Sequence, residues 1–146
     1  MIEKGDWWTA PTESEDGRLV MVTGRRDVDQ FRLNPRFGIR VEITWRYDDT
    51  GQGGMPDTAV STLMEQVQDA LQQEFIKDPV AILTGIYTGA GERNWVFYTL
   101  STHIFGRKIN QALAPFDLLP ISIYTENDPD WAEYAEMKAA SEITPG

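Results

Sequence analysis

The sequence has no cysteine, one histidine and no long apolar run, and each absence narrows the classes of protein to which it could belong. Without cysteine there are no disulfides, zinc–thiolate sites or thiol nucleophiles. His103 alone gives no basis for a Ser-His-Asp arrangement, and no apolar run approaches the roughly 18 residues that span a bilayer. The first residues lack the apolar segment of a secretory signal, so we expect a cytoplasmic protein with no membrane partner.

Basic residues are also scarce. Thirteen Lys and Arg stand against 23 Asp and Glu, which gives a formal net charge of −10. The charges cancel over residues 1–40, so the excess of acid lies after residue 40. This excess of negative charge repels phosphate backbones and favours a basic protein partner, although a solvated acidic surface with no partner has the same composition. We therefore expect no nucleic-acid binding.

The residues that are present predict one α+β domain over residues 1–146. Apolar side chains alternate from Ile39 to Tyr47, which is typical of a strand. They recur every three or four residues from Val60 to Phe75, which is typical of a helix, and we expect Asp57 to cap that helix. A hairpin with its turn at 89–94 follows, then a helix that Ser101 or Thr102 caps. A short strand and a final helix complete the chain.

From Ile39 the predicted order is strand, helix, strand, strand, helix, strand. This order predicts a ferredoxin-like split βαβ sandwich over 39–126, with a four-stranded antiparallel sheet and two helices on one face. Its first and third strands should lie in the middle. Residues 1–38 should add one or more N-terminal strands, among them Leu19–Thr23, and 127–146 a short C-terminal helix and tail.

The acidic stretch "ENDPDWAEYAE", residues 126–136, has the composition of a metal loop but not its spacing. A calcium loop that began at Glu126 would need glycine where Trp131 stands and glutamate where Met137 stands, so we expect no metal and no cofactor. The stretch fits a helix start better. Asp130 can cap the helix with Glu133 three residues on, and Trp131 and Tyr134 then share the face that anchors it.

Several segments together resemble a known family. "GGMPD" before the long helix, "TGAGERNWVFY" as the hairpin and "DPDWAEYAEM" near the C-terminus are similar to the bacterial family called domain of unknown function 695. The most specific segment is D-P-x-W-x-x-Y, formed by Asp128, Pro129, Trp131 and Tyr134. The resemblance implies a small cytoplasmic α+β domain with no assigned activity. A more distant likeness is to the ribonuclease E regulator of the B type, itself ferredoxin-like and acidic.

Two hypotheses for function follow, and the sequence favours the non-catalytic one. The first is a regulatory or protein-binding module that presents an acidic face to a basic partner, such as an Arg-rich segment of a nuclease. Its candidate binding residues are Asp48, Asp49, Asp128 and Asp130.

The second hypothesis is a small-ligand binder or enzyme that uses a pocket on the open face of the sheet. Its candidate residues are Arg46, Tyr98, Tyr124 and Glu126.

Trp95 and Phe97 lie where RNA recognition motifs carry stacking aromatics, but the basic and glycine positions of that motif are missing, so we expect core residues there. If the N-terminal segment leaves the outer sheet face uncovered, the aromatic and Ile content of that face favours a homodimer.

Overall fold

The computed structural model describes residues 6–49 and 53–142, so the predicted ends of the chain at 1–5 and 143–146, and residues 50–52 of the loop before the long helix, lie outside the described residues. Its centre is an antiparallel sheet with the strand order β1-β2-β4-β5-β3-β6. The strands are β1 Trp7–Glu13, β2 Leu19–Arg25, β3 Ile39–Arg46, β4 Ala81–Gly89, β5 Glu92–Thr99 and β6 Ile121–Asn127.

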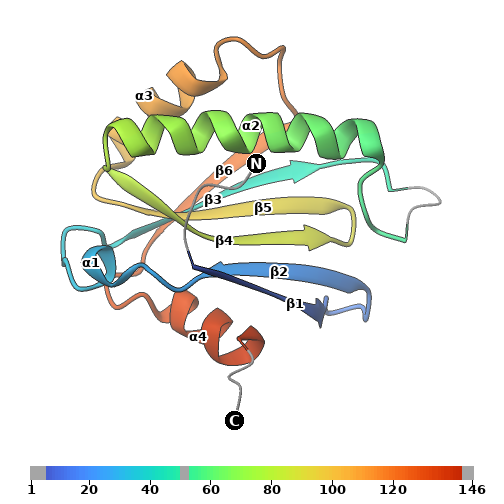
Figure 1. The fold of residues 1–146 in the computed structure, drawn as a ribbon, viewed down its shortest axis with the longest axis horizontal. Coiled ribbons are helices and arrows are strands. Elements are labelled where there is room, and N and C mark those ends of the chain that lie inside the picture. The colour runs from blue at the N-terminus through green and yellow to red at the C-terminus, as the bar shows by residue number, and fades with distance from the viewer. Residues whose placement is uncertain (1–5, 50–52, 143–146) are drawn as a thin grey trace.

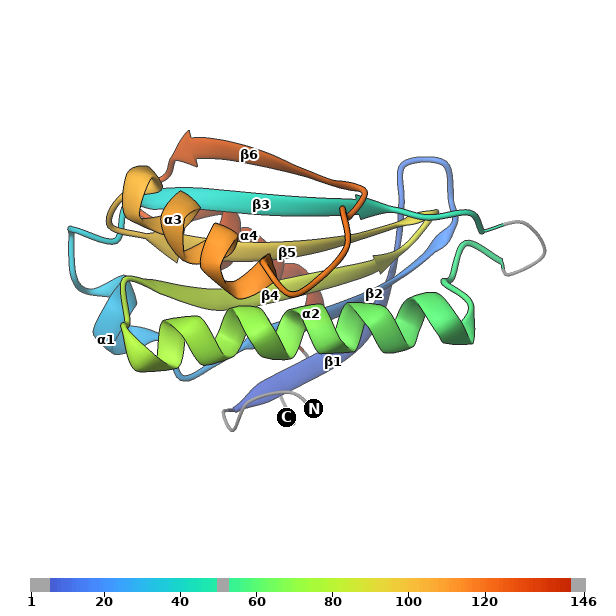
Figure 2. The same cartoon turned by 90° about the horizontal axis from the view of Figure 1, so that it is seen from above.

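The helices lie on both faces of the sheet. They are α1 Asp29–Arg32, α2 Thr58–Lys77, α3 Thr102–Leu113 and α4 Ala132–Ser141. Helices α2 and α3 lie on one face, called here the inner face, and α4 crosses the other, the outer face (Figure 1, Figure 2). No helix in the described part of the chain is long and apolar enough to cross a membrane.

The α+β class is confirmed, and the sheet has six strands because the expected N-terminal extension supplies two more than the predicted four-stranded unit. Strands β1 and β2 continue the sheet beyond β4. The first and third strands of the predicted unit, β3 and β5, do lie next to each other in the interior of the sheet. The alternation that predicted β3 is visible in its burial, because Val41, Ile43 and Trp45 are buried and the residues between them are not.

Both long helices begin at the predicted caps. The Asp57 carboxylate accepts a hydrogen bond of 2.8 Å from the Val60 amide at the start of α2. The Ser101 hydroxyl accepts one of 3.2 Å from the Ile104 amide at the start of α3. Each bond satisfies an amide that has no partner within its helix, which fixes where the helix starts.

The inner face carries the larger core, in which aromatic rings from both helices and the sheet meet. Phe75 of α2 stacks on Phe105 of α3 at 5.2 Å, and both rings contact Phe97 of β5. Trp95 is fully buried, and its indole donates a hydrogen bond of 2.8 Å to Gln68 of α2. The predicted core role of Trp95 and Phe97 is therefore confirmed.

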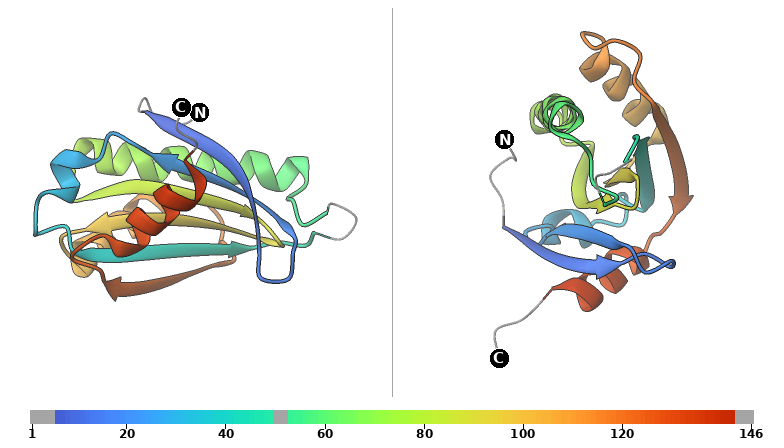
Figure 3. Two further views of the ribbon diagram at one scale, coloured as in Figure 1. Left: turned by 90° about the horizontal axis from the view of Figure 1, so that it is seen from below. Right: turned by 90° about the vertical axis from the view of Figure 1, so that its right-hand side faces the viewer.

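The outer face carries a second core beneath α4. Trp131, Tyr134 and Met137 pack there against sheet residues that include Val96 and Tyr98. The helix comes close to the sheet at Gly85, where an added Cβ would lie 3.0 Å from the Met137 sulfur. Seen from below, α4 covers the middle of this face and leaves β6 uncovered (Figure 3). The outer face is thus only partly open.

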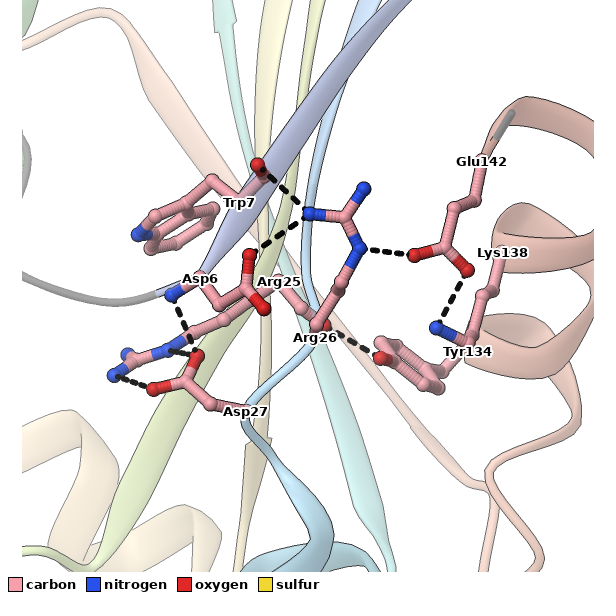
Figure 4. A network of polar contacts seen from close by, with 8 residues as sticks. All are labelled: Asp6, Trp7, Arg25, Arg26, Asp27, Tyr134, Lys138 and Glu142. Atoms are coloured by element: carbon pink, nitrogen blue, oxygen red, sulfur yellow. Dashed lines mark hydrogen bonds and ion pairs between the residues drawn. The ribbon is translucent and has the colours of Figure 1, made fainter. Parts of the chain in front are cut away.

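A polar network ties β1 and β2 to α4 (Figure 4). Arg26 donates to Asp6 at 2.8 Å and also contacts Glu142, which pairs with Lys138 at 2.7 Å. In the same network Tyr134 donates to the main-chain carbonyl of Arg25. Two of these contacts, Arg26 with Glu142 and Tyr134 with Arg25, join residues more than 100 positions apart, so the docking of α4 and the pairing of the two N-terminal strands depend on each other.

Candidate functional site: a polar groove on the outer sheet face

The segment D-P-x-W-x-x-Y builds one wall of the site, and Asp128 is its central residue. The Asp128 carboxylate accepts hydrogen bonds from the amides of Ala132 at 2.9 Å and Glu133 at 3.0 Å, and from the Tyr98 hydroxyl at 2.6 Å. The helix is therefore capped by Asp128, and the prediction that Asp130 caps it is wrong. Asp130 has the usual spacing of a cap, but its side chain is exposed and both amides bond to Asp128 instead.

The difference has a backbone cause at Trp131. This residue adopts a left-handed conformation with φ of 55°, which turns the chain so that Asp128 faces the first amides of α4. The conformation costs of order 1–3 kcal/mol for a side chain of this size. It is offset by contacts: the buried indole stacks on Tyr98 at 4.0 Å and donates a hydrogen bond of 2.7 Å to the Phe37 carbonyl.

The pKa values of Asp128 and Tyr98 are shifted in opposite directions. Desolvation alone would raise the pKa of Asp128, but the hydrogen bonds from Tyr98, Glu133 and Ala132 outweigh it and hold that pKa below its ordinary value. Burial, together with the Asp128 charge, raises the pKa of Tyr98. At neutral pH the pair is therefore a carboxylate with a neutral phenol as its donor, which locks α4 to β5.

Next to this wall lies a groove of about 350 Å³, which we call the outer groove. Of the described residues, ten line it: Ser14, Val20, Arg40, Glu42, Tyr87, Gly89, Ala90, Glu92, Asn94 and Glu133. They come from β2, β3, β4 and β5, from the turns of two hairpins and from the first turn of α4. Because Asp128 holds the Glu133 amide, the cap also fixes the acidic rim of the groove.

Arg40 is the one cation among these ten residues, and it is already neutralised. Its guanidinium lies 3.0 Å from Glu42 on its own strand and 3.2 Å from Glu126 on β6. Desolvation would lower the pKa of Arg40, but Glu42, Tyr98 and Glu126 together raise it, so the side chain stays charged. Because Glu42, Glu92 and Glu133 also line the groove, its lining has two more negative than positive charges.

Tyr87 of β4 and Asn94 of β5 are the neutral polar residues that the sheet contributes to the groove. Burial raises the pKa of Tyr87 to about 12, with Glu133 and Glu42 adding to the rise and Arg40 opposing it. Its hydroxyl therefore stays protonated and can both donate and accept. Asn94 is held by Thr44, which donates to its Oδ1 at 2.6 Å, and donates in turn to Glu92 at 3.1 Å.

The four acids predicted to form a binding face do not come together. Asp48 and Asp49 follow the end of β3, where Asp49 is 3.4 Å from Arg18. The Asp128 amide bonds to Gly38, just before β3 begins. The two pairs of acids are thus separated by the length of β3, about 25 Å at the rise of an extended strand. Asp128 is also buried, with its oxygens engaged by the cap.

The four predicted pocket residues share the outer face but do not line one cavity. All four side chains are on the same face of the sheet as Arg40, which lies opposite Tyr98 on β5 and opposite Glu126 on β6. Tyr98 is buried under Trp131, while Glu126 holds Arg40 at the edge of the groove. Tyr124 is exposed on β6, and Arg46 is exposed with Glu92 at 3.6 Å.

Sequence reasoning missed Glu42, Tyr87 and Glu133 as site residues. Glu42 does alternate with buried neighbours on β3, which marks its face, but nothing in the pattern indicates what lies beside it. Glu133 was assigned to a capping box only. Their meeting depends on where α4 docks. Within residues 6–49 and 53–142, no group of three or more His, Asp or Glu is placed to hold a metal ion.

Comparison with known proteins agrees with the resemblance seen in the sequence. The model of a family of unknown function, DUF695, matches residues 6–137. Neither a curated protein nor a solved structure matches the chain. The matched range contains β1, every residue of the outer groove and most of α4. This chain therefore belongs to the DUF695 family of unknown function.

Proposed function

We propose that the protein is a non-catalytic protein-binding module whose outer groove accepts a basic side chain of a partner protein. The observation that carries the proposal is the lining of the groove, where Glu42, Glu92 and Glu133 outnumber Arg40, the one cation of the lining, which is already paired. A lysine or arginine entering between these carboxylates would gain charge-assisted hydrogen bonds in a partly desolvated site.

The proposal keeps the basic partner expected from the net charge and moves its binding site. The acids at Asp48 and Asp49 lie about 25 Å along β3 from Asp128, so they cannot share one basic side chain with it. The glutamates of the groove come from β3, β5 and α4 and line one hollow. Net charge attracts such a partner over a longer range and speeds its association.

The neutral polar groups support a peptide as the ligand. The Tyr87 hydroxyl and the Asn94 amide can donate hydrogen bonds to the main chain of a partner on either side of the basic side chain.

A non-catalytic role is supported by the place of His103, which is exposed on α3, on the far side of the sheet from the groove. On the likeness to the ribonuclease E regulator, an Arg-rich segment of an RNA-processing protein is the partner class that we propose.

The test is calorimetric titration with a six-residue arginine peptide at low and high salt. The double variant Glu42→Gln/Glu133→Gln should weaken binding by about 30-fold, because each of the two lost charge-assisted contacts contributes about 1 kcal/mol. The matched control is Asp69→Asn/Asp117→Asn, which changes the net charge by the same amount in α2 and beside α3, on the inner face of the sheet. It should leave the affinity within about twofold.

Equal weakening by both variants would show that the peptide responds to net charge alone and would overturn the groove as the site. A peptide of six glutamates should not bind the wild-type protein. Thermal unfolding of both double variants should confirm that they remain folded, so that a loss of binding reports on the groove.

A small cationic ligand is the second candidate, since a groove of about 350 Å³ falls in the size range of small-molecule sites. An amine such as a diamine or polyamine would use the same carboxylates. Titration with free arginine separates the two. Binding as tight as that of the peptide would favour the small ligand, whereas binding about 100-fold weaker would favour the peptide.

We also infer that residues 39–126 form a ferredoxin-like split βαβ sandwich. The inference is supported by the strand order β4-β5-β3-β6, by antiparallel pairing throughout and by α2 and α3 lying on one face. An experimental structure whose strand order differs from this one would overturn it.

A further inference from the structure

Strand β6 forms one edge of the sheet, and its edge is unprotected. Among the described strands it pairs with β3 alone. Natural edge strands are usually blunted by lysine, proline or a bulge, because an open row of main-chain groups can pair with another chain. The opposite edge follows this rule, since β1 has Pro11 at its centre. The seven residues of β6 include neither lysine nor proline and pair without a bulge.

The surface around β6 is almost uncharged in an otherwise acidic protein. From Ile109 to Thr125 the one charged residue is Asp117, although a quarter of the whole chain is charged. Large apolar side chains are exposed here, namely Leu118, Ile123 and Tyr124. Beside them lies an apolar groove of about 370 Å³, lined by Leu113, Phe116, Leu119 and Ile121 among others. Two copies with net charge −10 repel each other least where this surface faces its equivalent.

We propose that two copies of the chain form a homodimer by antiparallel pairing of β6 with β6, about a two-fold axis at Tyr124. In this register Tyr124 lies opposite Tyr124 of the second copy, Ile123 opposite Thr125, and Ser122 opposite Glu126. No like charges meet, and the paired aromatic and β-branched side chains are those that stabilise cross-strand contacts. The two sheets become one continuous sheet, with the outer groove of each copy remaining outside the interface.

The two-fold axis gives a sharp test at Tyr124, whose side chain is 58% exposed and tolerates substitution. Tyr124→Lys places two ammonium groups opposite each other, and Tyr124→Glu places two carboxylates there. In sedimentation equilibrium up to about 100 µM, where a micromolar Kd gives mostly dimer, the wild-type protein should have twice the monomer mass of 16.6 kDa. Each variant alone should be monomeric. An equimolar mixture of the two should recover the dimer mass, because lysine then faces glutamate.

The matched controls are Thr12→Lys and Thr12→Glu on β1, the opposite edge, which should both stay dimeric. Recovery in the mixture also shows that each single variant is folded. A wild-type protein that is monomeric across the concentration range would overturn the proposal and leave the edge open to a different chain. A dimer that persists in Tyr124→Lys, or a mixture that stays monomeric, would equally overturn pairing about Tyr124.

Discussion

Tyr98 and Asp128 are 30 residues apart and joined by a hydrogen bond of 2.6 Å between the phenol and the carboxylate. The bond links β5, an interior strand, to the segment that starts α4. The same carboxylate caps α4, so one side chain decides both where the helix begins and where it docks. The stability of the domain and the shape of the outer groove therefore depend on the same residue.

Asp128→Ala should lower the free energy of unfolding by about 3 kcal/mol, because it removes a helix cap and leaves the buried Tyr98 hydroxyl without its acceptor. Urea unfolding followed by fluorescence measures the loss. The matched control is Asp130→Ala, one of the exposed acids two residues on, which should change stability by less than about 0.5 kcal/mol. Equal losses would contradict the assignment of Asp128 as the cap.

Stability should also depend on pH through Asp128. Its folded-state pKa is depressed below the ordinary value of 3.8, so it contributes stability that is present above that value. The contribution is lost as the pH falls through the folded-state pKa. The stability difference between the wild-type protein and Asp128→Asn should be constant from pH 7 to about pH 5 and should shrink below about pH 4. A difference that grows on acidification would contradict the sign of the shift.

Gly24→Ala should destabilise the pairing of β1 with β2. An added Cβ would lie 2.2 Å from the Trp8 ring, which covers Gly24 from the neighbouring strand. Displacing this ring should cost about 1–3 kcal/mol. The control is Gly106→Ala in α3, where the added Cβ meets nothing within 4 Å. That change should stabilise the protein by up to about 1 kcal/mol, because alanine is the better helix former. Thermal unfolding of both variants gives the comparison.

Arg40→Gln should strengthen binding of the arginine peptide by about threefold or more while lowering stability. The substitution removes the one cation from the lining of the outer groove and frees Glu42 and Glu126. Calorimetry with the same peptide measures the affinity. Arg107→Gln, which makes the same charge change on the exposed side of α3, is the control. Weaker binding by Arg40→Gln would contradict a cationic ligand in the groove.

The sequence predicted the parts of this fold whose causes are local. Strand β3 follows from its alternation, and α2 and α3 from their apolar spacing and their caps at Asp57 and Ser101. Strand β1 was harder, because "WWTAPTE" contains proline and alternates only partly. It is a strand since it lies at the edge, where the missing amide of Pro11 costs little.

The candidate site could not be predicted in the same way. Asp130 has the spacing expected of a cap. Asp128 caps α4 instead because Trp131 adopts a left-handed backbone conformation that is uncommon for a large side chain. Its stacking on Tyr98 comes from tertiary packing. The outer groove joins β2, β3, β4, β5, two hairpin turns and α4, so its acidic lining appears only once these elements are in place.

The measurement that tests the central claim most directly is a map of backbone amide shifts by NMR during titration with the arginine peptide. The account predicts saturable shifts at Ala90, Asn94 and Glu133, which line the outer groove, and little change at Asp69 and Asp117, on the other side of the sheet. The shifts should vanish in Glu42→Gln/Glu133→Gln. Shifts centred on Asp69 and Asp117, or spread evenly over the acidic surface, would contradict the groove as the binding site.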